Sequence, residues 1–165
     1  MPQDVAHVSW SEAEVLLRLV CATMAGALIG WNRHRAGKPA GIGTYALVAL
    51  GAGLFVAIPS GGDATKMDAV SRVIQGVAAG VGFLGAGEIF RDDSNNRIVG
   101  LTSAAALWVT AGLGITIVAG PITEAIVATL LVVAVLELAP RIERQLPARA
   151  EPGARDTRSA NGTRK

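Results

Sequence analysis

The sequence has few charged side chains, few aromatic rings and a single cysteine. Only 17% of its 165 residues are charged, and only 4% are Phe, Trp or Tyr. A soluble domain normally carries about 25% charged residues, so this composition argues against an ordinary water-soluble protein. One cysteine, Cys21, cannot build a disulfide framework within the chain, and we expect it to be a small buried hydrophobe.

Residue patterns typical of enzymes are missing as well. There is no Ser–His–Asp or Cys–His arrangement, and His34 has no second His, Cys or Asp nearby. Gly80, Gly82 and Gly85 match GxGxxG, but an apolar run surrounds them instead of the strand, turn and helix that a dinucleotide site requires. We predict that the chain is not an enzyme. We also predict no catalytic residue, cofactor, metal site or nucleic-acid partner.

Long hydrophobic runs take the place of these missing features. Apolar residues make up 51% of the chain. Five runs contain no Asp, Glu, Lys or Arg: residues 19–32, 39–62, 73–87, 98–123 and 125–136. A membrane span needs roughly 20 mostly apolar residues. The sequence therefore predicts an all-α, polytopic membrane bundle with about five transmembrane helices.

We expect these helices at residues 12–31, 44–58, 68–90, 99–118 and 122–139, the second being short for a span. Glycine inside a helix costs ~1 kcal/mol relative to alanine in water, but in lipid small residues let helices approach closely. The glycine-dense helix at 68–90 is therefore expected at the centre of the bundle, and Gly80→Leu is expected to disrupt it. The expected packing residues are Gly26, Gly30, Gly76, Ala79, Gly80, Gly82, Gly85 and Gly87.

Positive charge lies mainly on one side of these expected spans. The loops 32–43 and 91–97 and the stretch from Arg141 are rich in Arg and Lys, whereas the opposite side has Lys66 and the boundary residue Arg72. Short basic loops stay in the cytoplasm. We thus predict a short outer N-terminus (1–11), a membrane domain (12–140) and a basic cytoplasmic tail (141–165). That tail lacks apolar periodicity and is expected to be disordered.

Five charged residues are the candidate functional side chains: Arg18, Arg33, Arg72, Glu88 and Arg91. Arg18 lies about one turn into the first expected helix. It either pairs with Glu14 near the outer surface or faces inward to bind a backbone carbonyl or a partner's carboxylate. Similar four-residue spacings permit ion pairs between Asp68 and Arg72 and between Glu137 and Arg141.

Glu88 also has two interpretations. A carboxylate in mid-membrane costs roughly 2.5–3.5 kcal/mol on insertion scales and often marks an ion path. Glu88, however, lies only three residues before Arg91, so it either pairs there near the headgroups or forms a functional polar site. Asp92 and Asp93 could offer oxygens to Mg²⁺, but we interpret them as part of a plain turn.

Three stretches resemble the MgtC/SapB family of small bacterial inner-membrane proteins. The first runs from Arg18 through Lys38-Pro39-Ala40-Gly41 and Thr44 to Phe55; the second runs from Ser71-Arg72 through VGFLGAG to Gly87. The third is GLTSAA from Gly100, with Leu107-Trp108 just after it. The resemblance implies a membrane domain of four or five helices in the bacterial inner membrane, and the N-terminus that the charges place outside would then be periplasmic.

The resemblance also implies a function. Members are associated with growth at low Mg²⁺ and with survival inside host cells. They resemble regulators that act by helix contact with other inner-membrane proteins, F-type ATP synthase among them, and a homo-oligomer is a further expected partner. The alternatives are an oligomeric transporter of Mg²⁺ or another cation, and a scaffold without a ligand. A transporter would need several inward acidic or carbonyl ligands, whereas this sequence offers one acid near a helix end.

The chain departs from the family pattern at several polar positions. It has Asn32 and His34 where acidic residues are common, Gly43 in place of Arg and Tyr45 in place of His. It also has Glu88 where a small or apolar residue is usual. These changes imply a rearranged polar network. Longer members add a soluble C-terminal domain, whereas a short tail is expected here.

Overall fold

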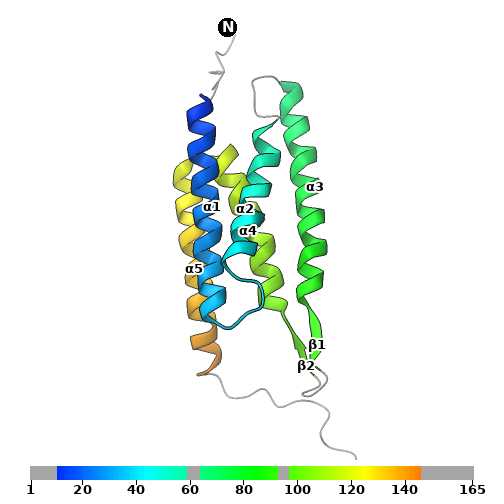
Figure 1. The fold of residues 1–165 in the computed structure, drawn as a ribbon, viewed down its shortest axis with the longest axis vertical. Coiled ribbons are helices and arrows are strands. Elements are labelled where there is room, and N and C mark those ends of the chain that lie inside the picture. The colour runs from blue at the N-terminus through cyan, green and yellow to red at the C-terminus, as the bar shows by residue number, and fades with distance from the viewer. Residues whose placement is uncertain (1–10, 59–63, 93–96, 146–165) are drawn as a thin grey trace, which may run out of the picture.

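The structure is a bundle of five helices that run alternately up and down (Figure 1). The computed structural model describes residues 11–58, 64–92 and 97–145, with side chains from residue 68 onward in the third helix. The helices are α1 Glu12–Arg35, α2 Ile42–Ala57, α3 Ala64–Glu88, α4 Leu101–Ala119 and α5 Ile122–Glu143. A short antiparallel hairpin, β1 Phe90–Asp92 and β2 Arg97–Val99, joins α3 to α4.

The predicted all-α membrane fold is confirmed. Four helices, α1, α3, α4 and α5, are long and apolar enough to cross a membrane. The fifth, α2, has 16 residues and is about 24 Å long at a rise of about 1.5 Å per residue. It is short for a span, as the sequence predicts, and it packs against α1 and α4.

The central helix is α4, so the expectation that the glycine-dense helix α3 lies at the centre is wrong. Half of the α4 span is buried, against 11% of the α3 span, and α4 contacts each of the other helices. The approach is closest at Gly114, where an added Cβ would collide with the Ala49 backbone of α2. A Cβ on Gly53 would likewise lie 2.9 Å from the Val118 side chain.

The predicted packing glycines divide into two groups. A Cβ on Gly26 would lie 2.8 Å from the Ala49 Cβ, and one on Gly30 would lie 2.6 Å from the Ile42 Cα, so both meet α2. Gly85 faces Ala104 of α4.

The other glycines of α3 meet no close neighbour among the described residues. An added Cβ has nothing within 4 Å at Gly76, Gly80, Gly82 or Gly87, and Ala79 is exposed. The reason is that α3 turns Val77, Val81 and Gly85 toward α4 and keeps its remaining small residues on the outside. Gly80→Leu therefore has no helix of the same chain to displace, contrary to the expectation.

Several helix ends also differ from the sequence-based boundaries. Helix α1 continues to Arg35 instead of ending near Trp31, with Arg33, His34 and Arg35 in its last turn, where cations favour the helix dipole. Helix α5 continues through Pro140 to Glu143.

The two ends of the expected turn at 91–97 belong to the strands of the hairpin, and residues 93–96 lie outside the described residues. Its strands pair Phe90 with Val99 and Asp92 with Arg97. Gly100 follows with φ +93°, a conformation that favours glycine. A Cβ there would collide with the Glu88 carbonyl, so this glycine lets the chain turn back closely from the hairpin into α4.

Some predictions fall on residues that the structure does not describe. They concern the outer N-terminus up to residue 10, the residue Asp93 and the tail from residue 146. These remain predictions, as does the position of the Lys66 side chain.

Candidate functional site

The most buried charged residue lies in a polar cluster of Arg33, Tyr45, Glu88 and Ser103, which we name the Arg33 cluster. Arg33 lies in the last turn of α1, is only 3% exposed, and donates from Nη2 to the Ser103 Oγ at 3.1 Å. The Tyr45 hydroxyl of α2 donates to the Ser103 backbone oxygen at 3.1 Å. Ser103 in the first turn of α4 thus joins α1 to α2.

The charges of this cluster are incompletely paired. Glu88, at the end of α3, and Arg33 are both close enough to act electrostatically on the Tyr45 hydroxyl. Glu88 is half-buried, but it forms no ion pair with Arg33. The Nε of Arg33 has no hydrogen-bond partner among the described residues. A buried ion is costly unless it is paired and hydrogen-bonded, so this cluster is the candidate functional site.

The sequence analysis identified two of the four residues of the Arg33 cluster, Arg33 and Glu88. It placed Arg33 in a basic loop, whereas the longer α1 carries it into the bundle. It offered Arg91 as the partner of Glu88, but Glu88 forms no ion pair with Arg91, which lies exposed on β1. Ser103 was missed, and Tyr45 was noted only as a departure from the family pattern. Their signal was a hydroxyl group inside an otherwise charge-free apolar run.

We expect Ser103→Ala to lower stability measurably. The substitution removes the acceptor for the Arg33 Nη2 in a buried site, and losing a hydrogen bond to a charged group costs about 1.5–3 kcal/mol. The measurement is the thermal unfolding temperature of the purified protein in detergent. Thr110→Val is the matched control, because Thr110 carries a buried hydroxyl on the same helix and, among the described residues, bonds only to the Ala106 carbonyl of its own helix. Equal losses in the two variants would contradict the prediction.

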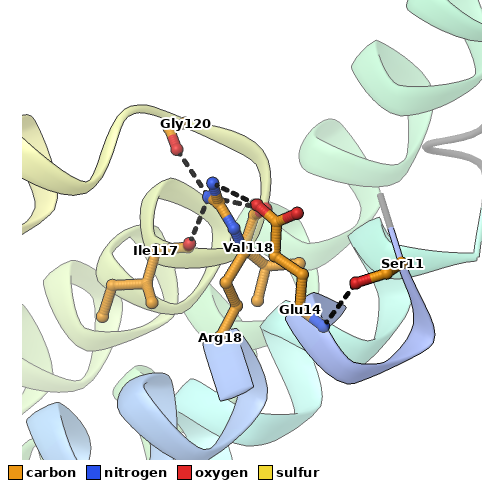
Figure 2. A network of polar contacts seen from close by, with 6 residues as sticks. All are labelled: Ser11, Glu14, Arg18, Ile117, Val118 and Gly120. Carbon is orange, nitrogen blue, oxygen red and sulfur yellow. Dashed lines mark hydrogen bonds and ion pairs between the residues drawn. The ribbon is translucent and has the colours of Figure 1, made fainter. Parts of the chain in front are cut away.

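A second polar cluster lies at the opposite end of the bundle and is centred on Arg18 (Figure 2). Its Nη1 donates to the carbonyls of Ile117 at 3.1 Å, Val118 at 3.4 Å and Gly120 at 2.8 Å. Its Nη2 pairs with the Glu14 Oε1 at 3.2 Å. Both predicted interpretations of Arg18 thus occur together, because one guanidinium reaches Glu14 and the carbonyls at once.

The position of this arginine follows from its surroundings. The last carbonyls of a helix have no partner within the helix, and Arg18 supplies one for the end of α4. At the start of α1, Ser11 accepts a hydrogen bond from the Glu14 backbone N–H at 3.2 Å, which is one half of the predicted capping box. The other half does not form, since the Glu14 side chain turns to Arg18.

A third polar contact joins α1 to α5 at the end of the bundle that holds the Arg33 cluster. The Asn32 Nδ2 donates to the Glu137 Oε1, and the Arg141 Nη2 donates to the Glu137 Oε2 at 3.1 Å. The spacing of Glu137 and Arg141 therefore does produce an ion pair. Asp68 and Arg72 have the same spacing but do not pair with each other, and both are exposed.

The described part of the chain holds no group of three or more His, Cys, Asp or Glu residues placed to bind a metal ion. The predicted absence of a metal site and of a cofactor stays a prediction. The Asp92–Asp93 turn cannot be judged as a whole, since Asp93 lies outside the described residues. The chemistry that the described polar groups offer is hydrogen bonding and ion pairing between helices.

A family model and individual relatives both match this chain over most of its described residues. A model of the MgtC family matches residues 19–145. Protein SrpB of Synechococcus elongatus is 49% identical over 113 residues, which cover 62% of each chain. No solved structure matches the chain.

Two enterobacterial relatives extend the match. A putative magnesium transporter of Escherichia coli, YhiD, is 39% identical over 132 residues, or 76% of this chain and 60% of the relative. Protein MgtC of Salmonella typhimurium is 39% identical over 140 residues, or 82% of this chain and 58% of the relative. The chain thus spans about three fifths of the length of the relatives it matches.

Proposed function

This chain belongs to the MgtC family of membrane proteins, and from that membership we propose that it is a non-enzymatic regulator linked to Mg²⁺ homeostasis. It acts by helix contact with other proteins of the bacterial inner membrane, and F-type ATP synthase is one candidate partner. The competing proposal is Mg²⁺ transport, which the name of the Escherichia coli relative suggests.

The observation that carries the proposal is the nature of the bundle's interior. Helices α1 and α4 meet α2 almost backbone to backbone at Gly26 and Gly114, and Gly53 of α2 lies against the Val118 side chain of α4, which leaves the middle of the bundle apolar and filled. Among the described residues the buried polar groups are the side chains of Arg33, Ser103 and Thr110 and the Tyr45 hydroxyl. Mg²⁺ requires oxygen ligands, whereas the buried charge here is a cation that would repel it. This interior favours a regulator over a transporter.

The outer surface of α3 supports contact with other membrane helices. Helix α5 presents large side chains such as Leu130 and Leu131 to its surroundings, as a lipid-facing surface does. Helix α3 also exposes the large side chains of Phe83 and Leu84, but the turn before them presents Gly76, Ala79 and Gly80. Small residues on a membrane helix let another helix approach closely, so α3 is the proposed contact surface.

The charge distribution supports the proposed orientation. Exposed basic residues gather at the end of the bundle that holds the Arg33 cluster: Arg35, Lys38, Arg91, Arg97, Arg141 and Arg144. Lys and Arg accumulate in cytoplasmic loops. We therefore place this end in the cytoplasm and the start of α1 on the periplasmic side of a bacterial inner membrane.

A flux measurement tests the proposal against its competitor. We expect the purified chain in liposomes to give no more Mg²⁺ flux than protein-free liposomes, while the same chain restores growth of a deletion strain at low Mg²⁺. The reason is that the described interior offers no chain of oxygen ligands across the bundle. Flux that appears with the protein and disappears in Glu88→Ala would show that transport is the correct function. Protein-free liposomes are the negative control, and liposomes that contain a known Mg²⁺ channel are the positive control.

A further inference from the structure

We propose that α3 has a second, closed position in which it packs against α2 of the same chain, and that an ion pair between Arg33 and Glu88 holds it there. The structure shows the open position, in which a groove separates the two helices. The inference rests on the proposed function in taking α3 as a contact surface. It adds how that surface is regulated, because closure hides it.

The groove between α2 and α3 has two matching walls. It has a volume of about 750 Å³, and its apolar walls include Leu47, Gly51 and Phe55 of α2 with Gly76, Gly80 and Leu84 of α3. On each helix these residues lie four apart, so each wall is a continuous ridge. Two ridges of this kind pack against each other in the commonest class of helix crossing. The walls thus have the form of a helix contact that the open position leaves unmade.

Glycines on both walls allow a close approach. A Cβ on Gly51, Gly76 or Gly80 would meet nothing within 4 Å. On its other sides, α2 already meets Gly26 of α1 and Gly114 of α4 almost backbone to backbone. Small residues let membrane helices approach closely, so α3 can reach α2 as α1 and α4 do.

The attachment of α3 to the bundle leaves room for this movement. Helix α3 packs mainly on α4 and touches α2 little. Its contact with α4 runs along one side, through Val77, Val81 and Gly85, and each of Gly76 and Gly80 lies one residue before a valine of that side. A small roll of α3 on α4 therefore turns the glycines onto α2, and such sliding of packed helices is a common conformational change.

The Arg33 cluster supplies the latch of the closed position. Arg33 is buried, and its Nε has no hydrogen-bond partner among the described residues, which is costly for a buried ion. Glu88 lies four residues after Leu84, so it continues the α3 ridge of Gly76, Gly80 and Leu84. It already acts electrostatically on the Tyr45 hydroxyl, as Arg33 does. The roll that brings Leu84 onto α2 brings the Glu88 carboxylate to the Arg33 guanidinium.

Closure and contact with a partner exclude each other. In the closed position Gly76 and Gly80 lie against α2, so a helix of another protein cannot reach them. In the open position they are exposed. A partner that binds the α3 ridge therefore shifts the chain to the open position, and the Arg33–Glu88 pair competes with that partner.

A disulfide across the groove tests the closed position. In a Cys21→Ala background, we expect Gly51→Cys with Gly80→Cys to lose both thiols to an intrachain disulfide when native membranes are oxidised. The control pair is Leu131→Cys with Gly80→Cys, since α5 and α3 lie on opposite sides of the bundle (Figure 1). A disulfide requires Cα atoms within about 7 Å, so the first pair should react roughly tenfold faster. Equal rates would overturn the closed position.

Removing the charge of Glu88 tests the latch. A hydrogen bond to a charged group stabilises by enough to shift an equilibrium about tenfold, so Glu88→Gln is expected to slow the groove disulfide roughly tenfold. Glu137→Gln is the matched control, because Glu137 is a half-buried acid at the same end whose partners Asn32 and Arg141 lie outside the groove. An unchanged rate in Glu88→Gln, or an equal loss in both variants, would overturn the latch.

A photo-reactive group on α3 separates this inference from the proposed function. Phe83 is 81% exposed in the turn after Gly80, so Phe83→p-benzoylphenylalanine reports membrane proteins that touch α3. Adducts that the groove disulfide abolishes and dithiothreitol restores would support regulation by closure, whereas adducts that persist in the oxidised protein would overturn it. Adducts without any groove disulfide would overturn closure and leave the contact role of α3 standing. A disulfide without adducts, even in Glu88→Gln, would support the closed position and contradict the contact role.

Discussion

Replacing Gly114 with leucine is expected to prevent the bundle from forming. At this point α4 meets α2 so closely that even a Cβ would collide with the Ala49 backbone. Overpacking a core usually costs about 1–3 kcal/mol, but a backbone cannot move aside as a flexible side chain can. We expect a loss above about 4 kcal/mol, which is rare for one substitution. The measurement is the yield of monodisperse protein after detergent extraction, together with its unfolding temperature.

Gly112→Leu is the matched control for this prediction. Gly112 lies two residues away on the same helix, and a Cβ there would meet nothing within 4 Å. Glycine-to-leucine exchange changes intrinsic helix propensity equally at both sites, so the difference between the variants isolates the contact with α2. A folded Gly114→Leu protein with a normal yield would show that α2 and α4 do not pack as described.

Arg18→Ala is expected to give a protein that inserts into the membrane but is less stable and fails to restore growth at low Mg²⁺. The guanidinium bonds to three carbonyls at the end of α4, and losing it leaves them without this donor in a partly buried site. Hydrogen bonds to charged groups contribute about 1.5–3 kcal/mol each, and they are not additive. We expect roughly 2–4 kcal/mol of destabilisation, measured by unfolding in detergent alongside membrane content and growth.

Glu14→Gln separates the two contacts of Arg18. The Glu14 side chain is 42% exposed, and exposed ion pairs contribute about 0.2–1 kcal/mol. We therefore expect this variant to keep most of its stability and its growth phenotype, because the carbonyl contacts remain. If Arg18→Ala grows normally at low Mg²⁺ and unfolds at the original temperature, the arginine is only an anchor at the membrane surface.

The sequence predicts the number and type of helices well because the bilayer imposes a simple rule. Long charge-free runs must form helices in lipid, and each of the five runs lies mostly within one of the described helices. The ends are harder to predict, since they depend on contacts far along the chain. Arg33 extends α1 because its side chain reaches Ser103 of α4, and no local pattern around residue 33 reveals that partner.

Glycine spacing predicts close packing without identifying the helix that packs. Gly26 and Gly30 share the four-residue spacing of Gly76 and Gly80, yet the first pair meets α2 and the second pair meets no helix of its own chain. The difference lies in how α3 is rotated about its axis, and that rotation follows from Val77 and Val81 facing the core. Gly114, the tightest contact between α2 and α4, has Gly112 near it in sequence, and only the structure distinguishes the two.

The candidate site could be predicted only in part for a similar reason. The hydrogen bonds of the buried Arg33 cluster join α1, α2 and α4, and they span 58 and 70 residues of sequence. A single arginine or acid within an apolar run signals importance but not its partners. One partner of Arg18 was easier to predict, because Glu14 lies one helical turn away in the sequence.

The Arg18 contacts also have a consequence for how the chain is made. The carbonyls that Arg18 binds lie 99 to 102 residues further along the chain, and ribosomes add about 5–20 residues per second. The first helix therefore waits on the order of 5–20 s before its final partner is synthesised. Glu14 is already present during that delay, so the nascent helix can leave the translocon with its arginine neutralised. In this view the exposed glutamate assists biogenesis more than it holds the finished bundle together.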